Sequence, residues 1–230
     1  MSIPYIVAAT DFSARADRAL DRALMLGIER GCGVRVVHAL DYIEAEKADW
    51  TDLDLRMREC IGETECTTDF TFPEGSPPRA IARAGEADDV DLIVIGPARY
   101  NSIGDYFIGT AVDYVLRNTT KPVLVVKQRP RSRYKHIIAG TDFSEGSAHA
   151  IVKAAEMFPD AQIHIVHAWH VPFEGFQRDG HVAGQVEEDE QRVFGKFMEL
   201  LVKDAPHLAN ATTAMVRGGT HAALAAEFDK

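Results

Sequence analysis

Short apolar runs alternate along the chain with longer segments in which apolar side chains recur every three or four positions. The short runs are rich in Val, Ile and Leu, as in DLIVIG at 91–96, and indicate buried strands, whereas the longer segments indicate helices. In the first half we expect strands at 4–10, 34–40, 66–73, 91–96 and 122–127, and helices at 14–29, 48–63, 77–87 and from Thr110 onward. Because a helix separates each strand from the next, the pattern predicts a doubly wound parallel α/β sheet, which binds ligands beyond the carboxyl ends of its strands.

The beginning of the chain is repeated in its second half. YIVAATDFS at 5–13 returns as HIIAGTDFS at 136–144, and a helical pattern and a second strand follow each copy. The second strands, VRVVHAL and IHIVHAW, make His38 and His167 equivalent positions. The chain is therefore a duplicated unit.

The repeat also predicts the domain organisation. We expect a first domain at 1–128 and a second at 134–230, joined by the basic, proline-containing segment QRPRSR at 128–133. We interpret this segment as a solvated linker, with a docking patch as the alternative. By the offset of the repeat, the second copy lacks its fourth and fifth strands. Either the sequence is a truncated version of a longer chain, which we favour, or a partner surface supplies the missing strands.

Composition narrows the function classes. The 230 residues are 46% hydrophobic and 26% charged, which is typical of a globular protein, and the net charge is -10 with a pI near 5.3. An acidic chain has no broad attraction to nucleic acid or to an anionic membrane, since such binding needs clustered Lys and Arg. The N-terminus has no basic region of the kind that signal peptides carry, and no apolar run approaches the ~18 residues of a membrane span. We expect a cytoplasmic protein.

The cysteines and histidines do not form a recognisable metal or redox pattern. Three cysteines, without a CxxC pair, indicate reduced thiols rather than a disulfide framework. In HIVHAWH, strand alternation sends His164 and His170 to one face and His167 to the other, so we expect no metal site.

The segment GPARYNSIGDYFIGTA at 96–111 carries the candidate chemistry. Gly96 directly follows an apolar strand, and Gly109 and Thr110 open a helix. Glycine lets the backbone approach a ligand closely, and the N–H groups at a helix start point toward an anion, so this pattern predicts phosphate binding. Thr110 can cap the helix or donate its hydroxyl to a phosphate oxygen.

These motifs together resemble the universal stress protein family in its tandem form, over essentially the whole chain. The shared features are Thr10 and Asp11 after the first strand, DLIVIG, and the closing KPVLVV strand. The family motif G-x2-G-x9-G-[ST] is also present, except that its second glycine is replaced by Arg99. The resemblance implies a five-stranded parallel sheet of order 3-2-1-4-5, duplicated here with the second copy truncated. It also implies binding of ATP or a related adenine nucleotide, with Mg²⁺ accompanying the nucleotide.

The resemblance also implies which residues hold the nucleotide in the first domain. They are Ala9, Thr10, Asp11, Ala39, Gly96, Arg99, Gly109, Thr110 and Ala111. Arg99 stands where the family motif has glycine, so it either crowds the phosphates or holds them with its guanidinium. Asp11 can also act in a turn, and Asp142 repeats that turn in the second copy.

Two functions from different classes remain open. One is a stress-response regulator that binds a nucleotide and acts through conformation or oligomerisation, with at most slow ATP hydrolysis and no catalytic residues. The other is a nucleotide-independent assembly module with a degenerate phosphate loop. An enzyme is disfavoured because the sequence has no nucleophile elbow or GK[ST] loop, and Ser13 and Ser144 are interpreted as helix caps. The resemblance further implies a homodimer through the strand at 122–127.

Overall fold

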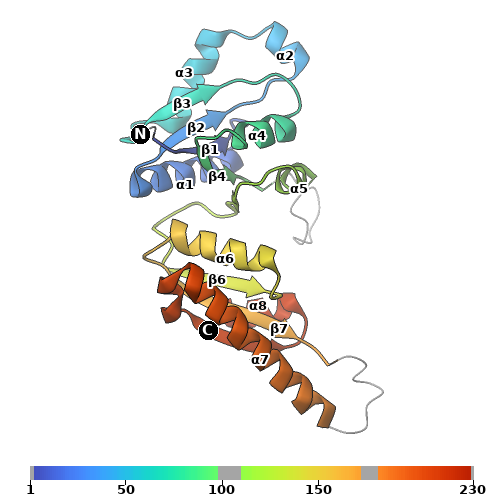
Figure 1. Ribbon diagram of the computed structural model, residues 1–230. Coiled ribbons are helices and arrows are strands. Elements are labelled where there is room, and N and C mark those ends of the chain that lie inside the picture. The colour runs from blue at the N-terminus through green and yellow to red at the C-terminus, as the bar shows by residue number, and fades with distance from the viewer. Residues whose placement is uncertain (1–2, 98–109, 172–180, 229–230) are drawn as a thin grey trace. The chain divides into compact units, whose positions relative to one another are not determined.

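The computed structural model describes residues 3–97, 110–171 and 181–228, and the chain divides into two compact units, Met1–Arg133 and Tyr134–Lys230 (Figure 1). Both units are built from parallel strands connected by helices. Within these described ranges, no helix is both long enough and apolar enough to cross a membrane.

The first unit is a five-stranded parallel sheet in the order β3-β2-β1-β4-β5. Its strands are β1 (Tyr5–Ala9), β2 (Gly33–Val37), β3 (Thr68–Thr71), β4 (Val90–Ile95) and β5 (Val123–Val125). The predicted doubly wound sheet with order 3-2-1-4-5 is confirmed. The strand order reverses direction between β1 and β4, and their carboxyl ends therefore form the switch point at which such sheets bind ligands.

Helices cover both faces of this sheet (Figure 1). They are α1 (Ala14–Arg30), α2 (Tyr42–Glu46), α3 (Trp50–Ile61), α4 (Pro77–Gly85) and α5 (Thr110–Arg117). On one face, Val7 and Ile93 pack in one cluster with Val112 and Val115 of α5. The short helix α2 was not expected from the sequence, which predicted a single helix at 48–63 in this region. It begins with a capping box, in which Asp41 and Glu44 each accept a backbone N–H of the other.

The second unit has a three-stranded parallel sheet in the order β6-β7-β8. Its elements are β6 (His136–Thr141), α6 (Glu145–Met157), β7 (Gln162–Trp169), α7 (His181–Asp204), the 3-10 helix η2 (Pro206–Asn210), β8 (Thr212–Arg217) and α8 (Thr220–Phe228). Residues from α6, α7 and β7 form its core, among them Ile151, Ile165 and Phe197. The order β6-β7-β8 corresponds to β1-β2-β3, which confirms the predicted duplication, and the described part of this unit has no counterparts of β4 and β5.

The segment at 128–133 is largely exposed, as expected for a solvated linker, and is also attached to α1 of the first unit. Arg22, which is buried, donates from Nη1 to the carbonyl oxygen of Ser132 at 2.9 Å. Arg129 pairs with Asp21 at 3.1 Å, and Arg133 pairs with Glu29. The exposed ion pairs contribute little stability individually, so the buried Arg22 is the main anchor.

Candidate functional site

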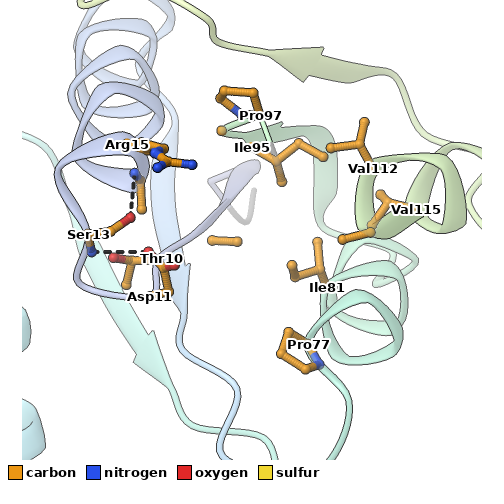
Figure 2. Close-up of a pocket in the computed structure, with 14 residues that line it drawn as sticks. Thr10, Asp11, Ser13, Arg15, Pro77, Ile81, Ile95, Pro97, Val112 and Val115 are labelled. Carbon is orange, nitrogen blue, oxygen red and sulfur yellow. Dashed lines mark hydrogen bonds between the residues drawn. The ribbon is translucent and has the colours of Figure 1, made fainter. Parts of the chain in front are cut away.

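A cavity of about 240 Å³ lies at the carboxyl ends of β1 and β4, between α1 on one side and α4 and α5 on the other (Figure 2). The residues that line it are Ala9, Thr10, Asp11, Ser13, Arg15, Ala16, Pro77, Ile81, Ile95, Gly96, Pro97, Ala111, Val112 and Val115. Five of the nine predicted nucleotide-binding residues are in this group, namely Ala9, Thr10, Asp11, Gly96 and Ala111.

Of the four remaining predicted residues, Ala39 and Thr110 are described by the structure and the other two are not. Ala39 follows β2 and is half-buried outside the cavity lining. Thr110 is the first residue of α5, as predicted for a helix start. Arg99 and Gly109 lie outside the described residues, so their predicted roles stay predictions.

The polar side of the cavity is the turn between β1 and α1. Thr10 Oγ1 accepts the backbone N–H of Phe12 at 3.0 Å, and Asp11 Oδ1 accepts that of Ser13 at 3.0 Å. Ser13 caps α1 by accepting the N–H of Ala16 at 3.3 Å, which confirms its predicted role (Figure 2). Each polar residue of TDFS therefore has a structural function in addition to lining the cavity.

The second unit repeats this turn in detail. Thr141 Oγ1 accepts the N–H of Phe143 at 2.9 Å, Asp142 Oδ1 accepts that of Ser144 at 3.0 Å, and Ser144 caps α6. Hydrogen bonds from the hydroxyl and the backbone N–H of Ser144, and from Ser147, lower the pKa of Asp142 to about 2. The recurrence shows that TDFS specifies a strand-to-helix turn irrespective of any ligand.

The opposite wall of the cavity is apolar. Ile81 of α4, Ile95 of β4, and Val112 and Val115 of α5 face the polar turn (Figure 2). Sequence reasoning did not assign these residues to the site, since their helical and strand spacing is that of ordinary core positions. The cavity therefore offers apolar contacts to a planar group on one side and hydrogen-bonding groups on the other.

Gly96 and Arg15 bring α1 close to the end of β4. A Cβ atom added to Gly96 would lie 3.1 Å from the carbonyl oxygen of Arg15, which is closer than most Cβ contacts. Glycine at this position is thus needed for helix packing as well as for the predicted phosphate approach. The guanidinium of Arg15, which no sequence motif marks, is a cation at the cavity that can bind a phosphate oxygen.

His38 supports the turn from the neighbouring strand. Its Nδ1 lies 2.9 Å from the carbonyl oxygen of Thr10, and since a carbonyl only accepts, Nδ1 carries the hydrogen. His167 makes the equivalent contact with Thr141 at 2.8 Å. The repeated histidines therefore hold the repeated turns.

The histidines of β7 lie on opposite faces of the second sheet. His164 contacts Glu227 of α8 at 3.1 Å, whereas His167 contacts Glu190 of α7 at 3.3 Å. Across the described ranges, no three His, Cys, Asp or Glu side chains are grouped closely enough to hold a metal ion. His164 and His167 thus serve two separate helix contacts.

The first unit is similar in sequence to a known protein family. A model of the Universal stress protein family matches residues 4–127. Universal stress protein MJ0577 from Methanocaldococcus jannaschii is 24% identical over 160 residues, which cover 56% of this chain and 99% of the relative.

Two solved structures match the fold across both units. A universal stress protein from Archaeoglobus fulgidus has a TM-score of 0.63 and 16% identity, over 98% of this chain and 81% of its own. A putative universal stress protein from Pseudomonas aeruginosa has a TM-score of 0.61 and 16% identity, over 95% of this chain and 75% of its own. At these identities the likeness shows the fold alone.

Proposed function

Because the chain belongs to the Universal stress protein family, whose model matches residues 4–127, we propose that its first unit binds ATP or a related adenine nucleotide. The observation that carries the proposal is the cavity at the carboxyl ends of β1 and β4, where the strand order reverses. Asp11 and Thr10 offer acceptors to ribose hydroxyls, and Arg15 offers a cation to the phosphates. Mg²⁺ would accompany the phosphates as part of the ligand.

The binding function is assigned to the first unit only. The cavity needs β4 and α5, which supply Ile95, Gly96, Val112 and Val115. The second unit has the TDFS turn, but its described sheet consists of β6, β7 and β8, without a counterpart of β4. A nucleotide would therefore meet only half of a site there.

We further propose that the nucleotide regulates assembly. β5 is the edge strand of the first sheet and pairs with β4 alone among the described strands. An open strand edge can pair with the same edge of a second copy, as the family resemblance implies for residues 122–127. Light scattering across a range of protein concentrations, with and without ATP, measures this directly. A monomer under all conditions would rule out the dimer.

The experiment that tests nucleotide binding compares Asp11→Ala with Asp142→Ala. Both carboxylates accept the same turn hydrogen bond at 3.0 Å, so the two substitutions remove the same local support. Thermal unfolding is measured with and without millimolar ATP, AMP and Mg²⁺. A ligand that binds only the folded state at 100 times its dissociation constant adds about 2.7 kcal/mol of stability.

The expected result is a nucleotide-dependent rise in Tm that is lost in Asp11→Ala and kept in Asp142→Ala. A rise that survives in Asp11→Ala and disappears in Asp142→Ala would place the site in the second unit. The absence of any rise in the unaltered protein would favour the nucleotide-independent assembly module.

A further inference from the structure

A second cavity in the first unit lies against a different face of α4 from the nucleotide site. It has a volume of about 540 Å³, and its lining includes Arg79 and Arg83 of α4, Tyr42 of α2, and Tyr114 of α5. On a helix with 3.6 residues per turn, these arginines are well separated from Pro77 and Ile81, which face the nucleotide cavity. The two cavities therefore use separate side chains of the same helix.

Arg79 and Arg83 form a pair of like charges. Residues four apart on a helix are neighbours, and like charges at that spacing destabilise the helix. Elsewhere in this unit the same spacing brings opposite charges together, since Arg58 Nε lies 2.7 Å from Asp54 Oδ2. Neither Arg79 nor Arg83 forms an ion pair with a carboxylate that the structure describes. Both arginines are exposed, so in a chain with a net charge of -10 these two neighbouring cations are accessible to an external anion.

The hydrogen-bond donors of this cavity are side chains rather than the backbone N–H groups of the helix terminus. Pro77 and Pro78 occupy the first positions of α4 and have no backbone N–H to offer. The hydroxyl of Ser76, which also lines the cavity, makes no helix-capping hydrogen bond. The donors among the lining side chains are thus the two guanidinium groups, this hydroxyl and the hydroxyls of Tyr42 and Tyr114.

We propose that this cavity binds a small phosphomonoester, with the phosphoryl group held by Arg79 and Arg83. A phosphomonoester carries a charge of about -1.5 to -2 at pH 7, and guanidinium groups bind its oxygens in a bidentate manner. Tyr42 and Tyr114 provide ring faces for a planar group attached to the phosphate. Glu74, the carboxylate among the described lining residues, disfavours ligands with further negative charge near it.

The proposal is tested by isothermal titration calorimetry, in which phenyl phosphate is titrated into the full chain and the heat of binding is measured. We compare the double variant Arg79→Gln/Arg83→Gln with Arg117→Gln, which removes an exposed arginine of α5 outside the cavity lining. The expected result is saturable binding that falls by at least about tenfold in the double variant and is unchanged in Arg117→Gln. Inorganic phosphate should bind more weakly than phenyl phosphate, because it has no ring to pack against the tyrosines.

Thermal unfolding of the double variant separates binding from a structural role. Since Gln removes a repulsive pair and retains helix propensity, the Tm without ligand should be equal or higher. The proposal would be overturned by a clearly lower Tm or by an equal loss of binding in Arg117→Gln. It would also be overturned if no binding were seen at 10 mM phenyl phosphate, since a dissociation constant of about 10 mM is the weakest that a specific site would show. Asp11→Ala should bind phenyl phosphate normally, which keeps this test independent of the nucleotide site.

Discussion

The ring of Phe143 stacks on the imidazole of His167, with centroids 4.0 Å apart and ring planes inclined by 28°. Phe143 holds this position with a left-handed backbone, at φ 64°, which is uncommon for any residue except glycine. In the first unit, Phe12 has φ 56°, and the centroid of its ring lies 4.4 Å from that of the His38 imidazole. The same strained conformation in both copies indicates that the aromatic contact offsets its cost.

Phe143 allows that balance to be measured. Phe143→Ala should lower the free energy of unfolding by about 2–4 kcal/mol, because the contacts with His167, Phe194 and Phe197 are lost while the strained backbone remains. Phe143→Gly loses the same contacts but relieves about 1 kcal/mol of strain. Urea unfolding should therefore find the glycine variant at least as stable as the alanine variant. The reverse order would show that the backbone at residue 143 is not strained.

Any side chain larger than that of Gly27 would clash with its neighbours inside the first unit. A Cβ atom at this position would lie 2.5 Å from Cys66 Sγ and 3.0 Å from Val34 Cγ2. Gly27→Ala should therefore lower the free energy of unfolding by about 1–3 kcal/mol, although alanine favours the helix. Adding Cys66→Ala removes the nearest clashing atom, and the double variant should recover part of the loss. Denaturant unfolding of the two single variants and the double variant would contradict this explanation if the effects were additive.

The acid stability of the second unit should depend on Asp142. Its pKa is about 2 in the folded protein, against about 3.9 in an unfolded chain. A lowered pKa stabilises the fold above the unfolded value, and this contribution disappears as the pH falls from about 4 to about 2. The stability difference between the unaltered protein and Asp142→Asn should therefore be larger at pH 6 than at pH 2. A difference that does not change with pH would refute the assignment, and a carboxyl NMR titration would measure the pKa itself.

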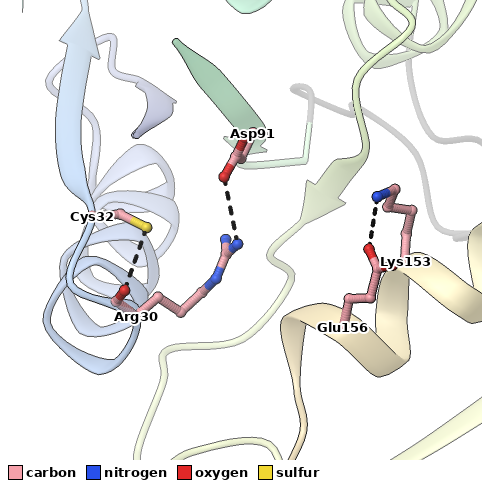
Figure 3. A network of polar contacts seen from close by, with 5 residues as sticks. All are labelled: Arg30, Cys32, Asp91, Lys153 and Glu156. Atoms are coloured by element: carbon pink, nitrogen blue, oxygen red, sulfur yellow. Dashed lines mark hydrogen bonds and ion pairs between the residues drawn. The ribbon is translucent and has the colours of Figure 1, made fainter. Parts of the chain in front are cut away.

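The cysteines should differ in reactivity toward a thiol reagent. Cys32 and Cys66 are buried and Cys60 is partly exposed, while burial raises the pKa of all three thiols. Figure 3 shows Cys32 donating to the carbonyl oxygen of Arg30 at 3.8 Å, beside the ion pair of Arg30 with Asp91. Labelling of the native protein at pH 7.5 should modify Cys60 slowly, and the other two only after unfolding. Early labelling of Cys32 would show that the end of α1 opens in the native state.

The first sheet was predictable because its strands are continuous apolar runs separated by helical patterns. The order of the strands came from the family resemblance, since alternation alone does not order them. The short helix α2 was missed for a physical reason: none of its residues is buried, and Tyr42 and Ile43 are exposed, so it has no apolar face. Only its capping box marks it in the sequence.

The candidate site was predictable where a motif recurs. The repeated TDFS identified Thr10 and Asp11, and the glycine after an apolar strand identified Gly96. The apolar wall was not predictable, because Ile81 and Val115 follow the same spacing as core residues, and only the fold shows that they border a cavity. Arg79 and Arg83 are likewise ordinary surface residues in the sequence, and only the tertiary structure places two tyrosines beside them.

The repeat places the same strand in different surroundings. β1 is paired on both edges, by β2 and β4, whereas β6 pairs with β7 alone among the described strands. Successive N–H groups of a strand point to alternate edges, so half of those in β6 point away from β7. Amides that are hydrogen-bonded within a sheet exchange with deuterium only when the structure opens. Two repeat-related strands will therefore have different exchange patterns, uniformly slow in β1 and alternately slow and fast along β6.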